Sequence, residues 1–566
     1  MDPIVEAELQ NVDVDVPFRL QTGHIHRTWA RTFTSRPELY LQPQTVEEVQ
    51  KIVKLARRCR RHIVLVGCGH SPSDLTLTSS WIVNLDRLCG VKSVDRDVQR
   101  ITAEAGIRLR AFNAVANENS LTVPNLGSID EQSLAGAMST GTHGSTLKHG
   151  TLSEKVLSLR IVLSDGTVKR CSATENEELF RASLLSLGAL GIIVEIEYQL
   201  CEATNIEWNQ VLLPLRTILD TWSTSLWTKE EFVRVWWLPY LRRAVVWSAS
   251  KTDEAPRPPK GSWYGGSVGF HTYHILLRLS NVFPSILPWI EWFVFGMQYS
   301  FTPGPKSATS AIEPMQHGLL MNCLYSQFVN EWAVPLSKGP EIISRLDAWL
   351  NREPFSQHNI PFDNKDLYVH APIEVRVSDT TRTSPRPYLD MSCSEEPTLY
   401  LNATLYRPFL CDPPCKDRYY EAFEWLMREY NGRPHWAKNF TEASGQKYLA
   451  TQYGSDLDRW LEVRDEADPD GIFIGSWHRR NVLPADRRSY RCEEREVRGV
   501  PAQDGGKSYV GEISGALRGQ DLDTVEETDQ SEEEVDKRER KSEMAGLTGT
   551  KVFDKISNSR IKWQYC

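Results

Sequence analysis

The sequence lacks the patterns that would mark a metal-binding, nucleic-acid-binding or exported protein. Its 11 cysteines are scattered, and no CxxC pair of the kind that zinc or a redox dithiol uses occurs among them. We therefore expect no metal and a reducing compartment. No long Lys/Arg run precedes the C-terminal tail and the formal net charge is −9, so nucleic acid is not expected as a partner. The acidic start at Met1 has neither a signal-peptide nor a transit-peptide pattern, which predicts that the protein is not secreted.

An uninterrupted apolar run that would predict a transmembrane helix is also missing. The most apolar stretch, residues 275–296, is broken by Pro284 and Pro288 and carries Arg278 and Glu291. A membrane-spanning helix needs roughly 20 mostly apolar residues. We predict a buried or interfacial segment, with a shallow membrane anchor as the alternative.

The length and composition are those of an ordinary globular protein. The chain has 566 residues, 40% hydrophobic and 25% charged, which is enough for two or three packed units. Thr45 and Glu48 have the spacing of a capping box before an apolar stripe and predict a helix. β-Branched or alternating segments predict strands at residues 63–66, 81–85, 100–105 and 159–163. After an N-terminal segment of residues 1–23, an α+β domain is therefore expected over residues 24–200.

A second unit, over residues 201–482, is rich in tryptophan and in alternating strands. Strands are predicted at residues 232–237, 367–370 and 373–377, which indicates an antiparallel sheet with covering helices. Beyond residue 483 the sequence becomes charged and rich in Gly and Ser, so residues 483–566 are predicted to be a disordered charged tail.

Two glycines precede a histidine directly after the strand predicted at residues 63–66. In the string Gly67-Cys68-Gly69-His70-Ser71, the glycines allow a tight turn whose consecutive N–H groups can hold an anionic group such as a pyrophosphate. Such a string in isolation is more typical of a plain glycine turn with a surface histidine.

Two further segments favour a bound dinucleotide. Residues 124–144 are dominated by small residues, which permit close approach by a flat or extended ligand, and residues 187–194 form a predicted glycine-bearing strand. Neither a Rossmann GxGxxG with its acid nor a P-loop GKS/T is present, so another fold is needed. The expected cofactor-binding residues are Gly67, Cys68, Gly69, His70, Ser71, Gly127, Ser128, Ser133, Gly136, Ser139, Gly141, Thr142, His143, Gly191 and Ile192.

Together these segments resemble the vanillyl-alcohol-oxidase, or PCMH, type of FAD-binding fold, and most closely the aldonolactone oxidases of fungi that act on D-arabinono-1,4-lactone. The resemblance spans about residues 24–482 and includes residues 26–33, 331–332, 435–438 and 468–473. It implies an FAD-binding domain and a cap-type α+β substrate domain. It further implies that FAD is bonded covalently to a ring nitrogen of His70, with FAD bound without that bond as the alternative. His143 is expected to shape the pocket rather than to act in catalysis.

The resemblance places the substrate chemistry on Glu374, Arg376 and Lys438. Glu374 and Arg376 are two residues apart on a predicted strand, so their side chains leave the same face, although an isolated pair of this kind is usually a salt bridge. Arg376 would stabilise negative charge developing on the flavin. Glu374 would hold sugar hydroxyls, and Lys438 would help to accept the hydroxyl proton.

Two comparisons within the wider family refine the expected substrate and oxidant. Bacterial alditol oxidases place a histidine and a threonine in a strand resembling residues 399–406, where we align Ala403 and Leu405, and this departure favours a lactone over an open-chain polyol. In plant galactonolactone dehydrogenase an alanine resembling the position of Gly127 blocks oxygen. Gly127 therefore favours an oxidase that forms hydrogen peroxide.

The expected reaction is the oxidation of an aldono-1,4-lactone, above all D-arabinono-1,4-lactone, by molecular oxygen to D-erythroascorbate and hydrogen peroxide. One rival is a dehydrogenase of the same fold that passes electrons to a cytochrome. A rival of another class is a catalytically silent, membrane-associated flavin-binding protein. The resemblance also implies a mitochondrial membrane as the location.

Overall fold

The computed structural model describes residues 1–321, 323–441 and 446–484. These residues all belong to one compact unit, Met1–Asp504, and the second unit, Gly505–Cys566, is outside them. The tail predicted to be disordered lies, from residue 485 on, outside the described residues.

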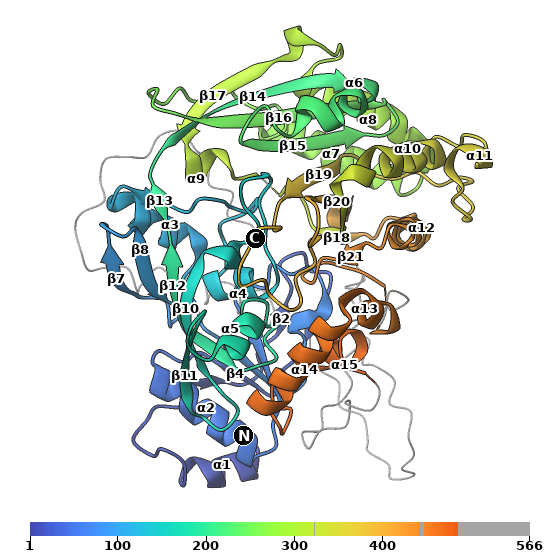
Figure 1. Ribbon diagram of the computed structural model, residues 1–566. Coiled ribbons are helices and arrows are strands. Elements are labelled where there is room, and N and C mark those ends of the chain that lie inside the picture. Colours follow the sequence, from blue (N-terminus) through green and yellow to red (C-terminus); the bar gives the residue numbers. More distant parts are fainter. Residues whose placement is uncertain (322, 442–445, 485–566) are drawn as a thin grey trace, which may run out of the picture. The chain divides into compact units, whose positions relative to one another are not determined.

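The first 200 residues build two main sheets (Figure 1). Their strands are β1 (Leu20–Gln21), β4 (Leu39–Leu41), β5 (Ile63–Val66), β6 (Trp81–Asn84), β7 (Val91–Asp95), β8 (Arg100–Glu104), β10 (Val156–Val162), β11 (Val168–Ser172) and β12 (Ile192–Gln199). One sheet has the order β1-β4-β6-β5, with β4, β6 and β5 parallel, and the other is antiparallel in the order β11-β10-β12-β8-β7. Two small ladders pair β2 (His26–Arg27) with β3 (Thr34–Ser35) and β9 (Leu121–Thr122) with β13 (Cys201–Glu202). The strands predicted at residues 63–66, 81–85, 100–105 and 159–163 are confirmed.

The helices of this part are α1 (Pro3–Leu9), α2 (Val46–Arg58), α3 (Leu109–Glu118), α4 (Leu134–Ser139) and α5 (Glu177–Ser183). The predicted helix start is confirmed, because the Thr45 hydroxyl accepts the N–H of Glu48 at 3.2 Å. The Glu48 carboxylate does not complete the capping box. It accepts instead from the N–H of Gln44 at 2.9 Å and pairs with Arg19 at 3.1 Å.

The strand predicted at residues 187–194 is wrong over most of its length. Strand β12 begins at Ile192, and the residues before it form a loop in which Leu187 and Gly188 have positive φ values of 54° and 73°. A left-handed backbone cannot continue a β-ladder, so the glycines make a bend here rather than a flat strand.

An eight-stranded antiparallel sheet dominates the second part of the chain and confirms the predicted antiparallel sheet. Its strands are β14 (Asn205–Pro214), β15 (Phe232–Leu238), β16 (Arg243–Thr252), β17 (Thr309–Pro314), β18 (Gln327–Pro335), β19 (Ile373–Ser378), β20 (Thr398–Tyr406) and β21 (Arg433–Pro434). Their order is β17-β14-β16-β15-β19-β20-β18-β21. The helices are α6 (Leu215–Thr221), α7 (Ser267–Ser280), α8 (Leu287–Tyr299), α9 (Met315–Gly318), α10 (Gly339–Leu350), α11 (Phe355–His358) and α12 (Lys416–Glu429). One face of the sheet packs with α10 and α12 in a core that includes Trp332, Leu401, Trp349 and Phe423.

The strand predicted at residues 367–370 is absent, and this segment is an extended loop before β19. Its backbone is satisfied by side chains instead of a ladder. The N–H of Val369 donates to the Tyr240 hydroxyl at 2.7 Å, and the carbonyl of Leu367 accepts from Nη2 of Arg352 at 3.2 Å. The alternating apolar pattern therefore reflects burial of this loop, not strand pairing.

The apolar stretch at residues 275–296 forms the end of α7, a turn and most of α8. Over the described residues, no helix combines the length and the apolar character needed to span a bilayer. Glu291 is 2% exposed and its carboxylate accepts the N–H of Leu241 at 2.7 Å, so this acid points into the protein. The prediction of a buried or interfacial segment agrees with this arrangement.

The C-terminal helices α13 (Gln446–Tyr453), α14 (Ser455–Ala467) and α15 (Ser476–Asn481) return to the N-terminal part. Trp460 and Trp477 belong to the same core as Trp81. The N–H of Ile63, at the start of β5, donates to the carbonyl of Ile472 at 2.7 Å. The division into two domains at residue 200 remains a prediction, because this last segment packs on the first.

Candidate active site

A cavity lies where the glycine-bearing segments meet. Of the predicted cofactor residues it is lined by Gly67, Cys68, Gly69, His70, Ser71, Ser133, Gly136, Ser139 and Gly191. The predicted residues that do not line it are Gly127, Ser128, Gly141, Thr142, His143 and Ile192. Sequence reasoning missed Phe473 and His478, which line the cavity from the far C-terminal segment.

The cavity wall fits an FAD molecule in its chemistry. Gly69 has φ +66°, which turns the chain sharply after β5 in the cavity wall. Turns of this kind can present consecutive backbone N–H groups to a pyrophosphate. Two lining side chains, Gln132 and Asp86, each have a buried oxygen, Oε1 and Oδ1 respectively, without a hydrogen-bond partner among the described residues. Buried acceptors of this kind need a partner, and the hydroxyl and amino groups of a dinucleotide can supply one.

His70 is held in the wall of this cavity with its ring stacked on Trp29. The ring centroids are 4.9 Å apart at 26°, and the N–H of Trp29 donates to the carbonyl of Gly69 at 2.7 Å. Burial lowers the pKa of His70 to about 4, and the nearby positive charges of Lys438 and Arg108 add to this. The imidazole is therefore neutral at physiological pH and has one ring nitrogen with a free lone pair.

The substrate-side residues lie in one row across the eight-stranded sheet. Asn402 on β20 is directly opposite Glu331 on β18 and Glu374 on β19, so the three side chains share a face. Arg376 leaves the same face, and its Nε is 3.4 Å from Oε2 of Glu374. The prediction that Glu374 and Arg376 point together is confirmed, while their roles remain predictions.

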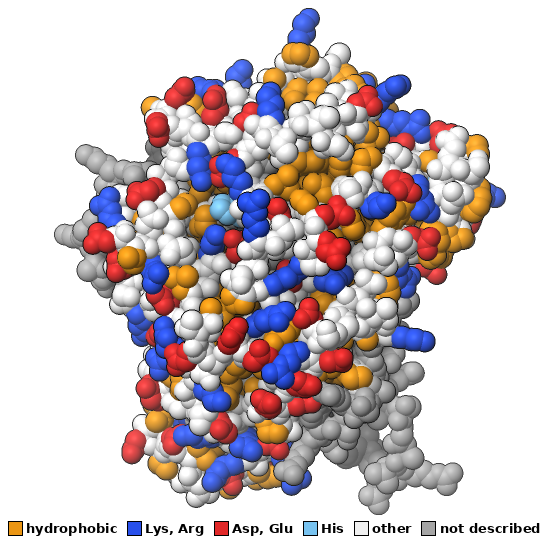
Figure 2. Space-filling model, in the orientation of Figure 1, with side chains coloured by type: hydrophobic (Ala, Val, Ile, Leu, Met, Phe, Trp, Pro, Cys, Tyr) orange, Lys and Arg blue, Asp and Glu red, His pale blue; other side chains and the backbone are white. Residues whose placement is uncertain are grey.

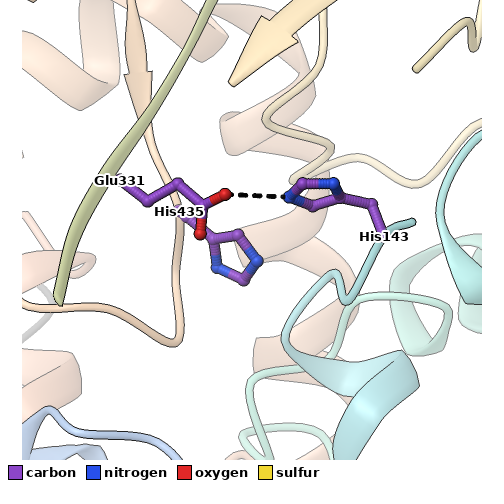
Figure 3. A group of neighbouring side chains, drawn as sticks. All are labelled: His143, Glu331 and His435. Atoms are coloured by element: carbon purple, nitrogen blue, oxygen red, sulfur yellow. Dashed lines mark ion pairs between the residues drawn. The ribbon is translucent and has the colours of Figure 1, made fainter. Parts of the chain in front are cut away.

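Glu331 is the centre of this polar cluster, and sequence reasoning did not select it. Its Oε1 is 2.5 Å from Nη2 of Arg376 and 3.3 Å from Nε2 of His143, and its Oε2 is 3.8 Å from Nζ of Lys438. Figure 3 shows the carboxylate pointing at the ring of His143, with the ring of His435 beside it. Glu331 is the one acid in β18 and belongs to residues 331–332 of the resemblance, and these were the signals that could have given it a role.

Electrostatics explain the charge states of the cluster. Burial alone would raise the pKa of Glu331, but Arg376, His143 and Lys438 hold it well below its usual value. Burial alone would lower the pKa of Arg376, but Glu331 and Glu374 hold it above its usual value. The carboxylate and the guanidinium are therefore both charged.

Lys438 joins the two halves of the site. Its segment follows β21, and the side chain of Asn439, next in sequence, donates to the carbonyl of Pro72 at 3.0 Å in the His70 loop. The hydroxyl of Ser73 donates to the carbonyl of Ala437 at 3.4 Å. Lys438 thus lies near both His70 and Glu331, and its side chain is 24% exposed.

Arg234 adds a buried cation that sequence reasoning also missed. It is 1% exposed, and none of its guanidinium nitrogens has a hydrogen-bond partner among the described residues. The register that pairs Val235 with Val375 places it next to Arg376. Burial lowers the pKa of Arg234 to about 10, against the influence of Glu374. Three cations and two carboxylates share the site, so it favours negative charge in a ligand.

The alignment of Ala403 and Leu405 with the substrate-side residues of alditol oxidases is wrong. Both side chains lie in the core on the opposite face of the sheet. The site face of β20 carries Asn402 and Thr404, which are linked by a 2.7 Å hydrogen bond. A one-residue shift in register reverses the faces of a strand, so Ala403 and Leu405 do not favour a lactone.

The ring nitrogens of His143 and His435 and the carboxylate of Glu331 are close enough to hold a metal ion. Part of this set is already engaged by other groups. Glu331 is paired with Arg376, and Nδ1 of His435 accepts the N–H of Ala437 at 3.2 Å. The adjacent cations oppose a further positive charge. We therefore treat the three as part of the polar cluster, and the expectation of no metal remains a prediction.

Comparisons with known proteins identify relatives over most of the chain. A family model described as D-arabinono-1,4-lactone oxidase matches residues 196–481, and one described as FAD binding domain matches residues 37–172. A relative from Neurospora crassa is 48% identical over 89% of this chain and 94% of its own length. Relatives from Yarrowia lipolytica and Saccharomyces cerevisiae, both named D-arabinono-1,4-lactone oxidase, are 39% and 36% identical over 81% of this chain and 98% and 96% of theirs.

The fold is also found in solved structures of low sequence identity. A cholesterol oxidase from Brevibacterium sterolicum has a TM-score of 0.67 at 14% identity and covers 84% of this chain and 98% of its own. A solvent-stable cholesterol oxidase has a TM-score of 0.63 at 16% identity, covering 82% and 99%. At such identities the likeness shows the fold alone. With the FAD binding domain match it confirms the predicted fold class.

Proposed function

Because the chain belongs to the D-arabinono-1,4-lactone oxidase family, we propose that it oxidises an aldono-1,4-lactone at the hydroxyl next to the lactone carbonyl. D-arabinono-1,4-lactone is the proposed substrate, because the relatives from Yarrowia lipolytica and Saccharomyces cerevisiae are named for it. The substrate loses two hydrogens to give D-erythroascorbate, and oxygen takes them up as hydrogen peroxide. The observation that carries the proposal is the meeting of the cofactor cavity and the charged sheet face at Lys438.

FAD bound in the cavity would supply the two-electron oxidant. The chain's own residues bind and orient the substrate. Glu374, held by Arg376 and Asn402, offers carboxylate oxygens to the sugar hydroxyls. Arg376 provides a fixed positive charge for the negative charge that accumulates in the buried site. Lys438, the most exposed member of the cluster, accepts the proton of the reacting hydroxyl.

The activity is tested by mixing the purified holoenzyme with D-arabinono-1,4-lactone, first without oxygen and then with it. We expect the yellow flavin absorbance to bleach without oxygen, and equimolar peroxide to form when oxygen is admitted. Lys438→Met should slow bleaching at saturating lactone by about 100-fold or more. Arg257→Met is the matched control, because Arg257 lies at the exposed edge of the sheet beside Ser310 and should leave the rate unchanged. A Lys438→Met enzyme as fast as wild type would contradict the role of Lys438.

A covalent bond between His70 and FAD is a finer part of the proposal. The neutral ring nitrogen can replace a hydrogen of the methyl group on the flavin's benzenoid ring. FAD bound in the cavity would supply the two-electron acceptor for this bond, with oxygen taking up the electrons and the displaced hydrogen leaving as a proton. The stacked Trp29 and the tight Gly69 turn fix the position of the imidazole. Support comes from the lowered pKa of His70, which leaves the reactive form in excess.

Oxygen as the acceptor is supported by the surroundings of Gly127. A Cβ at this position would lie 2.9 Å from Cγ2 of Thr142 and 3.8 Å from Oε1 of Gln132, which lines the cavity. Alanine here would therefore push the Thr142 side chain, whose hydroxyl accepts a hydrogen bond from Gln132 in the cavity wall. We propose that oxygen approaches the cofactor past Gly127, which distinguishes an oxidase from a dehydrogenase.

Membrane association is proposed through the surface of α7 and α8. Large apolar side chains there are exposed: Val268, Ile275, Leu279, Val282, Phe283, Trp289, Trp292 and Met297. Figure 2 shows hydrophobic side chains gathered on the upper part of the molecule, to which these helices belong in Figure 1. An exposed apolar surface with tryptophans is typical of shallow binding at a lipid interface. A mitochondrial membrane is proposed from family resemblance.

A further inference from the structure

His143 lies between two hydrogen-bond acceptors. Its Nδ1 is 2.9 Å from the carbonyl oxygen of Gly144, and its Nε2 is 3.3 Å from Oε1 of Glu331. A neutral imidazole has one N–H, so in either tautomer one of these contacts joins two acceptors. The contact is satisfied when the ring is an imidazolium or when the carboxyl is protonated. The pair of His143 and Glu331 can therefore bind one more proton.

The surroundings keep this proton site empty at rest. Burial lowers the pKa of His143, and the charge of Arg376 adds to the effect although Glu331 opposes it. Arg376 and Lys438 hold the pKa of Glu331 low against the effect of burial. The side chains of His143 and Glu331 are both 0% exposed, so solvent does not reach the pair directly.

The other neighbours of the pair do not fill the empty position. Tyr400 stacks on the ring of His143 with centroids 3.6 Å apart, and its hydroxyl contacts Ser378 at 2.9 Å. The ring of His435 is 5.5 Å from that of His143 between centroids. Stacking fixes the plane of His143 and so fixes the direction in which Nε2 faces Glu331.

Lys438 connects the pair to the substrate side. Its Nζ is 3.8 Å from Oε2 of Glu331, an oxygen without a hydrogen-bond partner among the described residues. Lys438 is partly exposed, whereas Glu331 and His143 are closed off behind it. A proton that reaches Lys438 therefore has a short route inward.

We propose that Lys438, Glu331 and His143 form a proton relay that stores the substrate's hydroxyl proton inside the protein. The relay rests on the proposed function. An N–H proton of the Lys438 ammonium passes to Glu331 and on to Nε2 of His143, where an N–H bond forms. The lone pair left on Lys438 takes up the substrate's hydroxyl proton as the O–H bond breaks. The electron pair of the broken C–H bond leaves with its hydrogen to FAD. Glu331 and His143 act through Lys438 and are positioning residues.

The first test is the pH dependence of flavin reduction by D-arabinono-1,4-lactone, followed without oxygen in a stopped-flow instrument. In the His143→Gln holoenzyme the amide can still donate to Glu331 but cannot take up a proton. We expect the wild-type rate to fall in acid, where solvent protons already fill the pair. The variant should reduce its flavin about 100-fold more slowly and lose this acid dependence.

His370→Gln is the matched control for the loss of a buried imidazole. His370 lies 2% exposed in the same half of the molecule, where it accepts a backbone N–H from Tyr406, and it has no contact with the cluster. This variant should keep the wild-type rate and pH profile. An unchanged rate and pH profile in His143→Gln would overturn the relay.

A second measurement uses wild-type enzyme alone, so it does not depend on the folding of a variant. A pH indicator in weakly buffered solution records the proton released during reduction without oxygen. The relay predicts that release lags behind bleaching of the flavin, because the proton stays on the pair until product leaves. Release in step with bleaching would overturn the relay while leaving the activity intact. A lactone that does not bleach the flavin at all would overturn the proposed function and the relay together.

Discussion

The proposed bond to the ring nitrogen of His70 would decide how firmly the cofactor is held. In wild type we expect yellow fluorescence to stay with the polypeptide on an acid-denaturing gel, because a covalent bond survives unfolding. His70→Ala should lose it, since the nucleophile is gone while the fold, in which the ring stacks on Trp29, remains. His24→Ala is the matched control, a nearby histidine stacked on Tyr40. Fluorescence that persists in His70→Ala would place the bond on another residue.

A methyl group at Gly127 is expected to separate the reaction with lactone from the reaction with oxygen. The φ of Gly127 lies outside the left-handed region, so alanine fits if Thr142 shifts by a few tenths of an ångström. Oxygen consumption in Gly127→Ala should fall by about tenfold, or roughly 1.4 kcal/mol in the barrier, while reduction of an artificial acceptor is maintained.

Strain and blockage at this position can be distinguished by a second change. Thr142→Ser removes the Cγ2 methyl that the new Cβ would touch. If the added methyl group in Gly127→Ala blocks oxygen, the double variant stays slow with oxygen. Recovery in the double variant, or equal loss with both acceptors in Gly127→Ala, would show that distortion and not a gate is responsible.

Sequence reasoning at the residue scale succeeded where a motif was local. The glycine–histidine turn and the pair of Glu374 and Arg376 are neighbours in sequence, so spacing alone indicated their shared direction. Glu331 and Arg234 were missed because their partners come from distant strands. Ala403 and Leu405 were predicted on the substrate side of the strand. A short alignment cannot detect a shift of one residue, but such a shift moves every side chain to the opposite face of the sheet.

At the scale of single elements, the α7–α8 surface should govern attachment to lipid. Trp289 and Trp292 are 51% and 43% exposed on it. Replacing either by serine should weaken binding to phospholipid vesicles about tenfold, because burial of a large apolar side chain contributes roughly 1.5–3 kcal/mol. Co-sedimentation with vesicles measures the effect. Phe355→Ser, at an exposed apolar residue on α11, should bind as wild type does, and equal binding by all three variants would exclude this surface.

Most strands and the start of α2 were predictable, because periodicity and capping are local signals. The order of the strands was not. Strands β18, β19 and β20 build the charged row, yet β18 lies beyond β20 in the sheet although it precedes both in sequence. Residues 367–370 were predicted to form a strand because apolar and polar residues alternate in buried loops as well as in strands. The side-chain partners of this segment, Tyr240 and Arg352, could not be inferred from it.

At the scale of the whole molecule, buried neutral histidines make stability depend on pH. Burial lowers the pKa of His370 to about 3, from 6.5 in an unfolded chain. His370 therefore contributes to the free energy of unfolding above pH 6.5, and this contribution is lost as the pH falls toward 3, since the unfolded chain binds the proton first. The free-energy difference between wild type and His370→Gln in urea unfolding should shrink by about 2 kcal/mol from pH 6.5 to pH 5. A difference that does not change with pH would show that His370 is protonated in the folded protein.

The return of the C-terminal segment to the cofactor cavity has a consequence for how the protein is made. Phe473 and His478 line that cavity, and Ile472 holds the first residue of β5. A ribosome has therefore synthesised the glycine turn, the whole substrate sheet and Lys438 before the last wall of the cavity emerges. Enclosure of the cofactor must be a late event in biogenesis, and a chain that stops short of Phe473 leaves the cavity open on one side.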